Sequence, residues 1–365
     1  MTNRFILSID GGGIRGIIPA KILSDLTKRL QKLGKTKPLH AYFDLIAGTS
    51  TGGIIAAGLS CPHPTASGKA ACTPEDLLKL YVEEGKDIFD NNAVFKILNP
   101  GGTLEERYSA TALEKKLISR MGAETLISKA LTKVLITAYD IEKRQAVFIT
   151  NSDADHSKIR FWQAARGSSA APTYFEPALV EDLGTKANQT TQSLALIDGG
   201  VFANDPSLAA YVEASKMGWL KPGDTLTVLS LGTGSASRKI PYNEAKNWGA
   251  LGWMNPLNDV PLVSIFMQGQ SSTASYQANV LLNHGKIKFN KDGSTVITKD
   301  NSKDANYFRI NGPLTRTPGA ASVNKPNDAM DDVSDGNLIA LQELADHFID
   351  QNSDMLNILA NRLGT

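Results

Sequence analysis

The start of the chain joins a strand-like run to a helical pattern, and this pairing constrains the fold more than any other feature. Residues 5–9, Phe-Ile-Leu-Ser-Ile, are apolar and β-prone, and they end at Asp10 and three glycines. From Ile18 to Leu33, apolar residues recur at the spacing of one helix face, with Pro19 tolerated in the first turn. A strand, a tight turn and a helix in succession form the basic unit of α/β proteins.

The same alternation of short apolar runs and helical patterns continues along the chain. β-prone runs predict strands at 42–47, 194–197 and 226–231, a hairpin of 133–138 and 146–150, and an edge-like pair at 286–290 and 307–310. Helical patterns fall within 75–130, broken by a turn at 99–102, and at about 205–217, 261–282 and from about 335. Strands that alternate with helices predict a three-layer α/β/α fold with a mostly parallel central sheet. Because no repeat or linker-rich segment divides the chain, we expect a single domain over residues 1–365.

Composition argues against several functional classes. Basic and acidic residues nearly cancel, at 38 Lys and Arg against 37 Asp and Glu, so net charge gives no support for nucleic-acid binding. No apolar run approaches the roughly 20 residues that span a bilayer. The apolar run after Arg4 is too short for a signal peptide, which predicts a cytoplasmic protein and leaves secretion by a route that reads other signals as the alternative. The spacing of Cys61 and Cys72 could close a small disulfide loop, but two free thiols in a reducing compartment are favoured, and no nearby residues complete a zinc site around them.

Residues 48–52, Gly-Thr-Ser-Thr-Gly, match the G-x-S-x-G pattern of a nucleophile turn. A buried-strand pattern precedes the match and a helical pattern follows it. In such a strand–turn–helix the serine lies on a strained bend with its hydroxyl exposed, and Gly48 and Gly52 let the two backbones approach. The alternative is a tight turn without chemistry. With both flanks in place, Ser50 is the predicted nucleophile, and the helix after it directs its positive end toward an oxyanion.

The glycine-rich segment at residues 10–16, Asp-Gly-Gly-Gly-Ile-Arg-Gly, also satisfies the G-x-G-x-x-G pattern of dinucleotide-binding proteins. That function requires an acidic residue at the end of the second strand, where it binds the ribose. Here the second strand ends in Ala-Gly-Thr-Ser at residues 47–50. The dinucleotide hypothesis therefore fails, and no cofactor is predicted.

The backbone N–H groups of the same loop suit acyl transfer. When a serine attacks a carbonyl, negative charge develops on oxygen, and each preorganised N–H donor stabilises it by about 3 kcal/mol. Gly12 and Gly13 are the best candidates for these donors. Arg15 either adds positive charge beside them or pairs with a structural carboxylate, and the sequence leaves both options open.

A serine nucleophile needs a proton acceptor. A triad in the order Ser, Asp, His would use a late histidine, and the candidates are His40, His63, His156, His284 and His347. Only His284 has the required order, and its place at the end of a helix favours a structural role. None of the five lies within a recognisable motif.

Asp198 is the stronger candidate for the base. It ends an apolar run at 194–197 and is followed by two glycines and a helical pattern. This position predicts a carboxylate at the carboxyl edge of a strand neighbouring that of Ser50, where open α/β sheets place their sites. The alternative is an Asp-Gly hairpin turn, which is disfavoured because the next element is helical.

Three motifs together, D-G-G-G-x-R-G at 10–16, G-T-S-T-G-G at 48–53 and D-G-G at 198–200, resemble the patatin family of lipid acyl hydrolases. Further patatin-like segments are residues 5–19, 168–175, 229–234, 247–249 and 330–332. The resemblance covers almost the whole chain and implies the patatin-like form of the α/β/α fold.

By this resemblance Ser50 and Asp198 form a catalytic dyad. The oxyanion hole would be lined by Gly11, Gly12, Gly13 and Arg15. The implied activity is metal-independent hydrolysis of fatty acyl esters, of the phospholipase A, lysophospholipase or galactolipase type. The implied partners are an acyl-lipid substrate, a membrane contacted peripherally and, as in some bacterial relatives, an activating small molecule or protein.

Other functions are compatible with the same dyad. The enzyme could transfer the acyl group to an alcohol or thiol, or the chain could be a ligand-activated effector or a storage protein. Apolar residues in the second half of the chain are candidates for an acyl groove, although such residues are more often ordinary core. These are Trp248, Trp253, Met254, Phe266 and Met267.

Overall fold

The computed structural model describes residues 2–89, 108–181, 183, 193–236, 239–255, 260–290, 292–296, 304–319 and 325–364. Within these residues an eight-stranded sheet has the order β5 (Ala178–Val180), β6 (Leu194–Asp198), β3 (Lys133–Asp140), β2 (Leu45–Thr49), β1 (Asn3–Ile9), β7 (Thr225–Leu231) and β8 (Tyr307–Ile310), with β4 (Gln145–Thr150) also paired to β3. The strands from β3 to β8 in this order are mutually parallel. The prediction of a mostly parallel sheet is confirmed.

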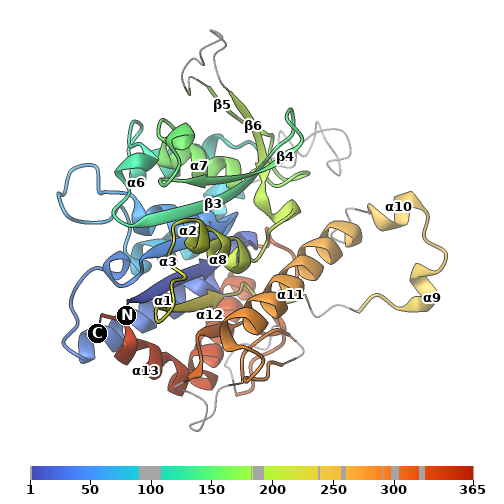
Figure 1. The fold of residues 1–365 in the computed structure, drawn as a ribbon. Coiled ribbons are helices and arrows are strands. Elements are labelled where there is room, and N and C mark those ends of the chain that lie inside the picture. Colours follow the sequence, from blue (N-terminus) through green and yellow to red (C-terminus); the bar gives the residue numbers. More distant parts are fainter. Residues whose placement is uncertain are drawn as a thin grey trace.

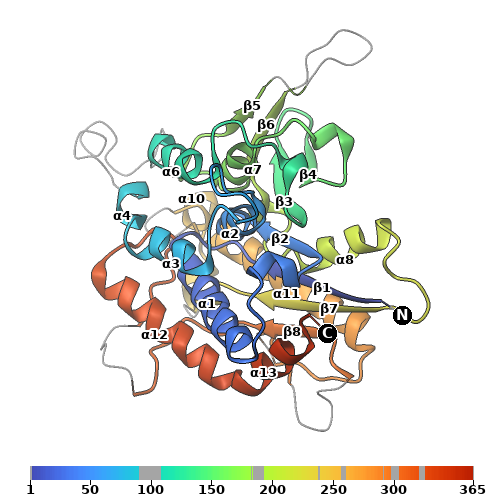
Figure 2. The same cartoon turned by 90° about the vertical axis from the view of Figure 1, so that its left-hand side faces the viewer.

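Helices cover both faces of the sheet (Figures 1 and 2). One face packs against α1 (Ile17–Lys32), α2 (Thr51–Ser60), α3 (Pro74–Val82), α7 (Phe161–Ser168), α12 (Asp335–Gln351) and α13 (Ser353–Arg362). The other face packs against α8 (Ser207–Lys216) and α11 (Pro261–Asn283). In β1, Leu7 and Ile9 belong to the first core and Ile6 to the second, because successive side chains of a strand point to opposite faces. The three-layer α/β/α architecture is therefore confirmed.

Shorter elements connect these layers. The other described α-helices are α4 (Gly85–Ile88), α6 (Thr111–Met121), α9 (Tyr242–Ala245) and α10 (Ala250–Trp253). Single 3-10 turns are formed by Gly13–Gly16, Leu39–Tyr42, Ile127–Lys129, Ala154–His156 and Gly199–Val201. The last of these turns follows β6 directly, and the first is separated from β1 by residues 10–12, so both strands end at irregular backbone.

Strand β3 pairs with three strands. One of its edges pairs with β4, and the other edge pairs first with β2 and then with β6. On one edge, β4 pairs antiparallel with residues 135–140, which confirms the predicted hairpin. On the other edge, β2 pairs parallel with residues 133–137, and β6 pairs antiparallel with residues 138–140. Thr49 is aligned with Thr137, and Asp198 with Ala138. The ends of β2 and β6 therefore meet beside β3.

Two strand predictions need correction. Residues 286–290 do not form a strand with β8, because β8 pairs parallel with β7 and Phe289 makes only an isolated bridge with Thr295. The second strand begins at Leu45 instead of Tyr42, since the residues before it form a 3-10 turn. The turn predicted at 99–102 lies outside the described residues.

The two cysteines are free, the alternative that the sequence favoured, and both are buried. Burial raises the pKa of both Cys61 and Cys72 to about 12, which keeps them as unreactive thiols at neutral pH. Across the part of the chain that the structure describes, no helix combines the length and apolar character needed to cross a bilayer.

Candidate active site

Ser50 lies at the sharp bend between β2 and α2. Its backbone has φ 55° and ψ −123°, a conformation that residues other than glycine rarely adopt. Close packing holds this bend, because a Cβ on Gly48 would clash with the carbonyl oxygen of Gly52, and one on Gly52 with the carbonyl oxygen of Ile9. The Ser50 N–H also donates to Ser168 Oγ at 2.8 Å. The predicted strand–turn–helix is present, with both glycines at positions that accept no side chain.

Replacing Gly52 by alanine is expected to lower the free energy of unfolding by about 3 kcal/mol, because the obstructing atoms belong to the backbone of β1 and cannot rotate away. The matched control is Gly269→Ala in α11, where an added Cβ meets nothing within 4 Å. The control is expected to raise stability by up to about 1 kcal/mol, as alanine favours helix over glycine. Chemical denaturation measures both. Equal stability of Gly52→Ala and the parent protein would contradict this close approach.

Asp198 ends β6 and faces Ser50. Its Oδ1 accepts a hydrogen bond from the Gly200 N–H at 2.7 Å, and its carboxylate lies beside the Ser50 hydroxyl in the wall of one cavity. The side chain is buried, and burial raises the pKa of Asp198 to about 6, although the Ser50 hydroxyl and the Gly200 N–H both lower it. The structure therefore brings the predicted nucleophile and base into contact, with a carboxylate that is more basic than an exposed aspartate.

The route by which Asp198 reaches Ser50 differs from the prediction. An ordinary neighbouring strand of a parallel sheet was expected, but β6 runs antiparallel, folded back along the part of β3 that extends beyond β2. Thr49 secures this junction, because its Oγ1 lies 2.7 Å from Thr137 Oγ1 and donates to the Ala203 carbonyl at 2.6 Å. The last residue of β2 thus binds both β3 and the segment that follows Asp198.

The glycine-rich loop lies directly against Ser50. A Cβ on Gly11 would be 3.1 Å from the Ser50 Cβ. Both backbone groups of Gly11 are bound, since its N–H donates to the Asn204 carbonyl at 3.1 Å and its carbonyl accepts from Thr233 Oγ1 at 2.6 Å. The loop therefore has a fixed position beside the nucleophile.

Gly12 and Gly13 form the part of the loop that is free to bind a ligand. Gly13 has φ 59°, and it is held close to Met330, whose carbonyl accepts from the Ile14 N–H at 2.9 Å. Within the described residues, the N–H groups of Gly12 and Gly13 have no hydrogen-bond partner. These two donors thus remain available, and Gly13 also lines the cavity that contains Ser50.

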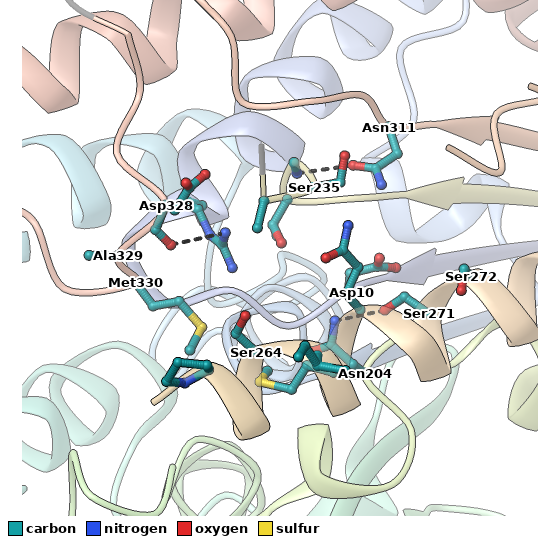
Figure 3. A pocket seen from close by; sticks show the side chains of 18 of the residues that line it. Asp10, Asn204, Ser235, Ser264, Ser271, Ser272, Asn311, Asp328, Ala329 and Met330 are labelled. Atoms are coloured by element: carbon teal, nitrogen blue, oxygen red, sulfur yellow. Dashed lines mark hydrogen bonds between the residues drawn. The ribbon is translucent and has the colours of Figure 1, made fainter. Parts of the chain in front are cut away.

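Arg15 is buried behind the loop. Its Nε donates to the Gly12 carbonyl at 3.2 Å and its Nη1 to the Asp328 carbonyl at 3.3 Å. The residue lines a polar pocket of about 460 Å³ (Figure 3) and is absent from the lining of the Ser50 cavity. Of the two options that the sequence left open, this placement supports a structural one, with two backbone carbonyl groups among the partners of Arg15.

An ion pair that sequence reasoning missed anchors the start of the loop. Arg309 in β8 reaches both oxygens of Asp10, with Nη1 2.7 Å from Oδ1 and Nη2 2.5 Å from Oδ2. Its Nη1 also lies 3.4 Å from Asp205 Oδ2, and all three side chains are buried. Because bidentate pairing fixes orientation as well as distance, it determines where β1 ends and the loop begins. The two partners lie 299 positions apart, so no local pattern reveals them.

Ser50 and Asp198 open into a cavity of about 80 Å³. Most of its other lining side chains are apolar and come from five helices and the loops beside them: Ile54, Tyr81, Ile88, Phe89, Leu113, Tyr174, Phe175, Val201, Val263, Met267 and Met330. An apolar cavity with two convergent polar groups is typical of a site for an apolar ligand that carries one reactive polar bond.

The five candidates for an acyl groove lie in different parts of the structure. Met267 lines the Ser50 cavity, but Trp248 lines the polar pocket and Phe266 a separate surface groove. Trp253 and Met254 lie in the segment before α11. Residue type and spacing identified α11 as apolar, but they could not tell which side of that helix meets the site.

None of the described residues that line the Ser50 cavity is a histidine. His284 ends α11 in a left-handed conformation with φ 52°, in agreement with the structural role favoured by its position in the sequence. The site therefore combines a serine on a strained bend, a buried carboxylate and a loop with free N–H groups. This arrangement can support nucleophilic attack on an acyl ester without an imidazole.

Comparison with known proteins gives consistent matches. Residues 7–211 match the family described as "Patatin-like phospholipase". Patatin-like protein 1 of Arabidopsis thaliana is 35% identical over 295 residues, which cover 76% of this chain and 70% of that protein. Patatin-17 of Solanum cardiophyllum is 30% identical over 378 residues, which cover 98% of this chain and 92% of that protein.

The similar proteins differ in whether they are described as active enzymes. "Probable inactive patatin-3-Kuras 1" of Solanum tuberosum is 31% identical, over 84% of this chain and 83% of that protein, so likeness to such proteins does not by itself decide activity. The solved structure of human GIVD cytosolic phospholipase A2 has a TM-score of 0.43 and 11% identity, and the match covers 99% of this chain and 60% of that chain. Since the family match spans more than half of its residues, this chain belongs to the patatin-like phospholipase family of lipid acyl hydrolases.

Proposed function

We propose that this protein is a serine lipid acyl hydrolase of the phospholipase A type, with Ser50 as nucleophile and Asp198 as base. The observation that carries the proposal is that the Ser50 hydroxyl and the buried Asp198 carboxylate lie side by side at the wall of one apolar cavity. Family membership supports acyl lipids as the substrate class.

Acylation uses the pair directly. As Ser50 Oγ bonds to the ester carbonyl carbon, its proton passes to Asp198, and the carbonyl oxygen becomes an oxyanion. The free N–H groups of Gly12 and Gly13 and the positive end of α2 stabilise that charge. The ester bond then breaks, the leaving alcohol takes the proton from Asp198, and the acyl group stays on Ser50.

Deacylation repeats the same steps with water. Asp198 accepts a proton from water as the oxygen attacks the acyl carbonyl, and the N–H groups hold the second oxyanion. The bond to Ser50 Oγ breaks, the proton returns to Ser50, and a fatty acid is released. Every proton transfer is carried out by Asp198, and no step requires a metal ion.

The environment of Asp198 suits this role. An exposed aspartate has a pKa of about 3.9 and is a weak base at neutral pH. With its pKa raised to about 6, Asp198 is still mostly ionised at pH 7 but binds a proton more strongly. Burial therefore supplies basicity that a histidine provides in other serine hydrolases.

The proposed reaction is tested by covalent labelling during turnover. We expect the protein to release fatty acid from mixed phospholipid vesicles and to lose this activity when a fluorophosphonate probe labels one serine. Mass spectrometry should place the label on Ser50. Ser169 is an internal control, because it lines the same cavity and its Oγ has no hydrogen-bond partner among the described residues. A label on Ser169, or activity that survives full labelling, would refute the proposal.

A further inference from the structure

Residues 239–255, here called the arm, lie outside the packed layers. The arm contains α9 and α10, and neither of these fully described helices has a buried residue. In Figure 1 both stand away from the sheet, to the right of α11. A segment that adds nothing to the core is expected to be polar, so the composition of the arm is informative.

The arm carries several apolar and aromatic side chains. Leu251 is 90% exposed and Tyr242 is 78% exposed, and Met254 is exposed as well. Trp248 and Trp253 pack edge to face, with ring centroids 5.1 Å apart and an angle of 84° between the rings. This contact gives the arm a defined shape while Leu251 remains in solvent. A cluster of this kind marks an interaction surface more often than a single exposed leucine does.

Charged residues are almost absent from the end of the arm and from α11. Asp259 is the only charged residue in the sequence from 247 to 283, although 21% of the whole chain is charged. The solvent-facing side of a helix normally carries charges. Instead α11 exposes Phe266, Tyr276 and Val280, with Phe266 58% exposed. Helix α11 thus exposes apolar side chains as the arm does, and these exposed side chains of the arm and of α11 are here called the apolar surface.

Helix α11 connects this surface to the candidate active site. Val263 and Met267 line the cavity that contains Ser50. Ile265 and Phe266, from the same turns of the helix, are exposed to solvent. One side of these turns thus faces the nucleophile and the other side belongs to the apolar surface.

We propose that the arm and the first turns of α11 dock onto the surface of a lipid bilayer and hold the Ser50 cavity against it. The inference rests on the proposed acyl hydrolase activity, because a substrate with long acyl chains resides in a bilayer. Exposed apolar side chains enter the interfacial region of a membrane favourably, and the uncharged residues 247–255 of the arm have no ionic group to desolvate there.

The side chains of the arm favour a bilayer over a protein partner. Tryptophan and tyrosine are enriched at membrane interfaces, where one end of each ring is apolar and the other is hydrated. Lys239 and Lys246 are exposed in the arm, and Glu244 is its only acidic residue, so the surroundings of the apolar cluster attract anionic lipids. A second copy of this chain is the rival occupant, and the experiment separates the two.

The experiment measures binding in the Ser50→Ala background, so that it does not depend on hydrolysis. The full chain is floated with vesicles of phosphatidylcholine and a minor fraction of phosphatidylglycerol. The test variant adds Leu251→Asp, and the matched control adds Ile339→Asp, a 50% exposed position on α12. Circular dichroism verifies that all three proteins are folded, and sedimentation gives their oligomeric state.

We expect the Ser50→Ala protein and the Ile339→Asp control to bind vesicles equally, and the test variant to bind at least about tenfold more weakly. Failure of all three to bind, or equal binding by all three, would overturn the docking surface whether or not Ser50 hydrolyses esters. The test variant could instead bind vesicles as well as the Ser50→Ala protein does but be a monomer where that protein is a dimer. This result would assign the arm to contact between copies and also overturn the proposal.

Discussion

Replacing Ser50 by alanine is expected to reduce kcat/KM for phospholipid hydrolysis by about 10⁴-fold or more. Ser50 Oγ is the atom that bonds to the acyl carbon in the proposed cycle, and alanine removes it while leaving the glycine loop and Asp198 in place. The residual rate would come from the oxyanion donors and from substrate binding. Fatty acid release from phospholipid vesicles measures the loss.

A second buried serine provides the control for this substitution. Ser60 ends α2, ten positions after the nucleophile, and its Oγ has no hydrogen-bond partner among the described residues. Ser60→Ala is therefore expected to keep most of the activity. If Ser50→Ala retained more than about one hundredth of the parent rate while folded, Ser50 would not be the nucleophile.

Replacing Asp198 by asparagine is expected to reduce kcat/KM by about 10⁴-fold, since asparagine preserves the shape but cannot accept the proton. Its Oδ1 can still accept the Gly200 N–H, so the local fold should survive. The measurement is the pH dependence of kcat/KM for the parent and the variant.

The sign of the pH effect follows from the raised pKa of Asp198. Below about pH 6 the carboxyl becomes protonated and can no longer act as base, so the parent rate should fall about tenfold per pH unit toward acid. Above about pH 6 the rate should be level. The rate of the asparagine variant should not show this fall toward acid. If the variant showed a fall with the same midpoint, the titrating group would be a residue other than Asp198.

The bend around Ser50 is the part of the site that could be predicted with most detail. Two glycines, a serine between them, a preceding apolar run and a following helical pattern are contiguous in the sequence. Steric contacts of the backbone act between residues that are adjacent in the sequence. The five residues 48–52 therefore determine this local geometry. The glycine-rich loop is predictable for the same reason.

The meeting of Ser50 and Asp198 depends on longer-range packing. The sequence identified both residues, but their contact requires β6 to run antiparallel along the end of β3, where a parallel neighbour was expected. The same holds for β8, whose partner is β7 and not residues 286–290. Strand pairing between distant segments depends on how whole layers pack. A short segment of the sequence does not contain that information.

The sequence by itself thus determined the fold class, the nucleophile turn, the glycine loop and the identity of the candidate base. Only the tertiary structure decided the environment of those groups. The raised pKa of Asp198 comes from burial, the anchor at Asp10 comes from Arg309 in a strand 299 positions away, and the apolar cavity is assembled from separate helices. Contacts and solvent exclusion of this kind depend on three-dimensional proximity, whereas bends and helix starts depend on neighbours along the chain.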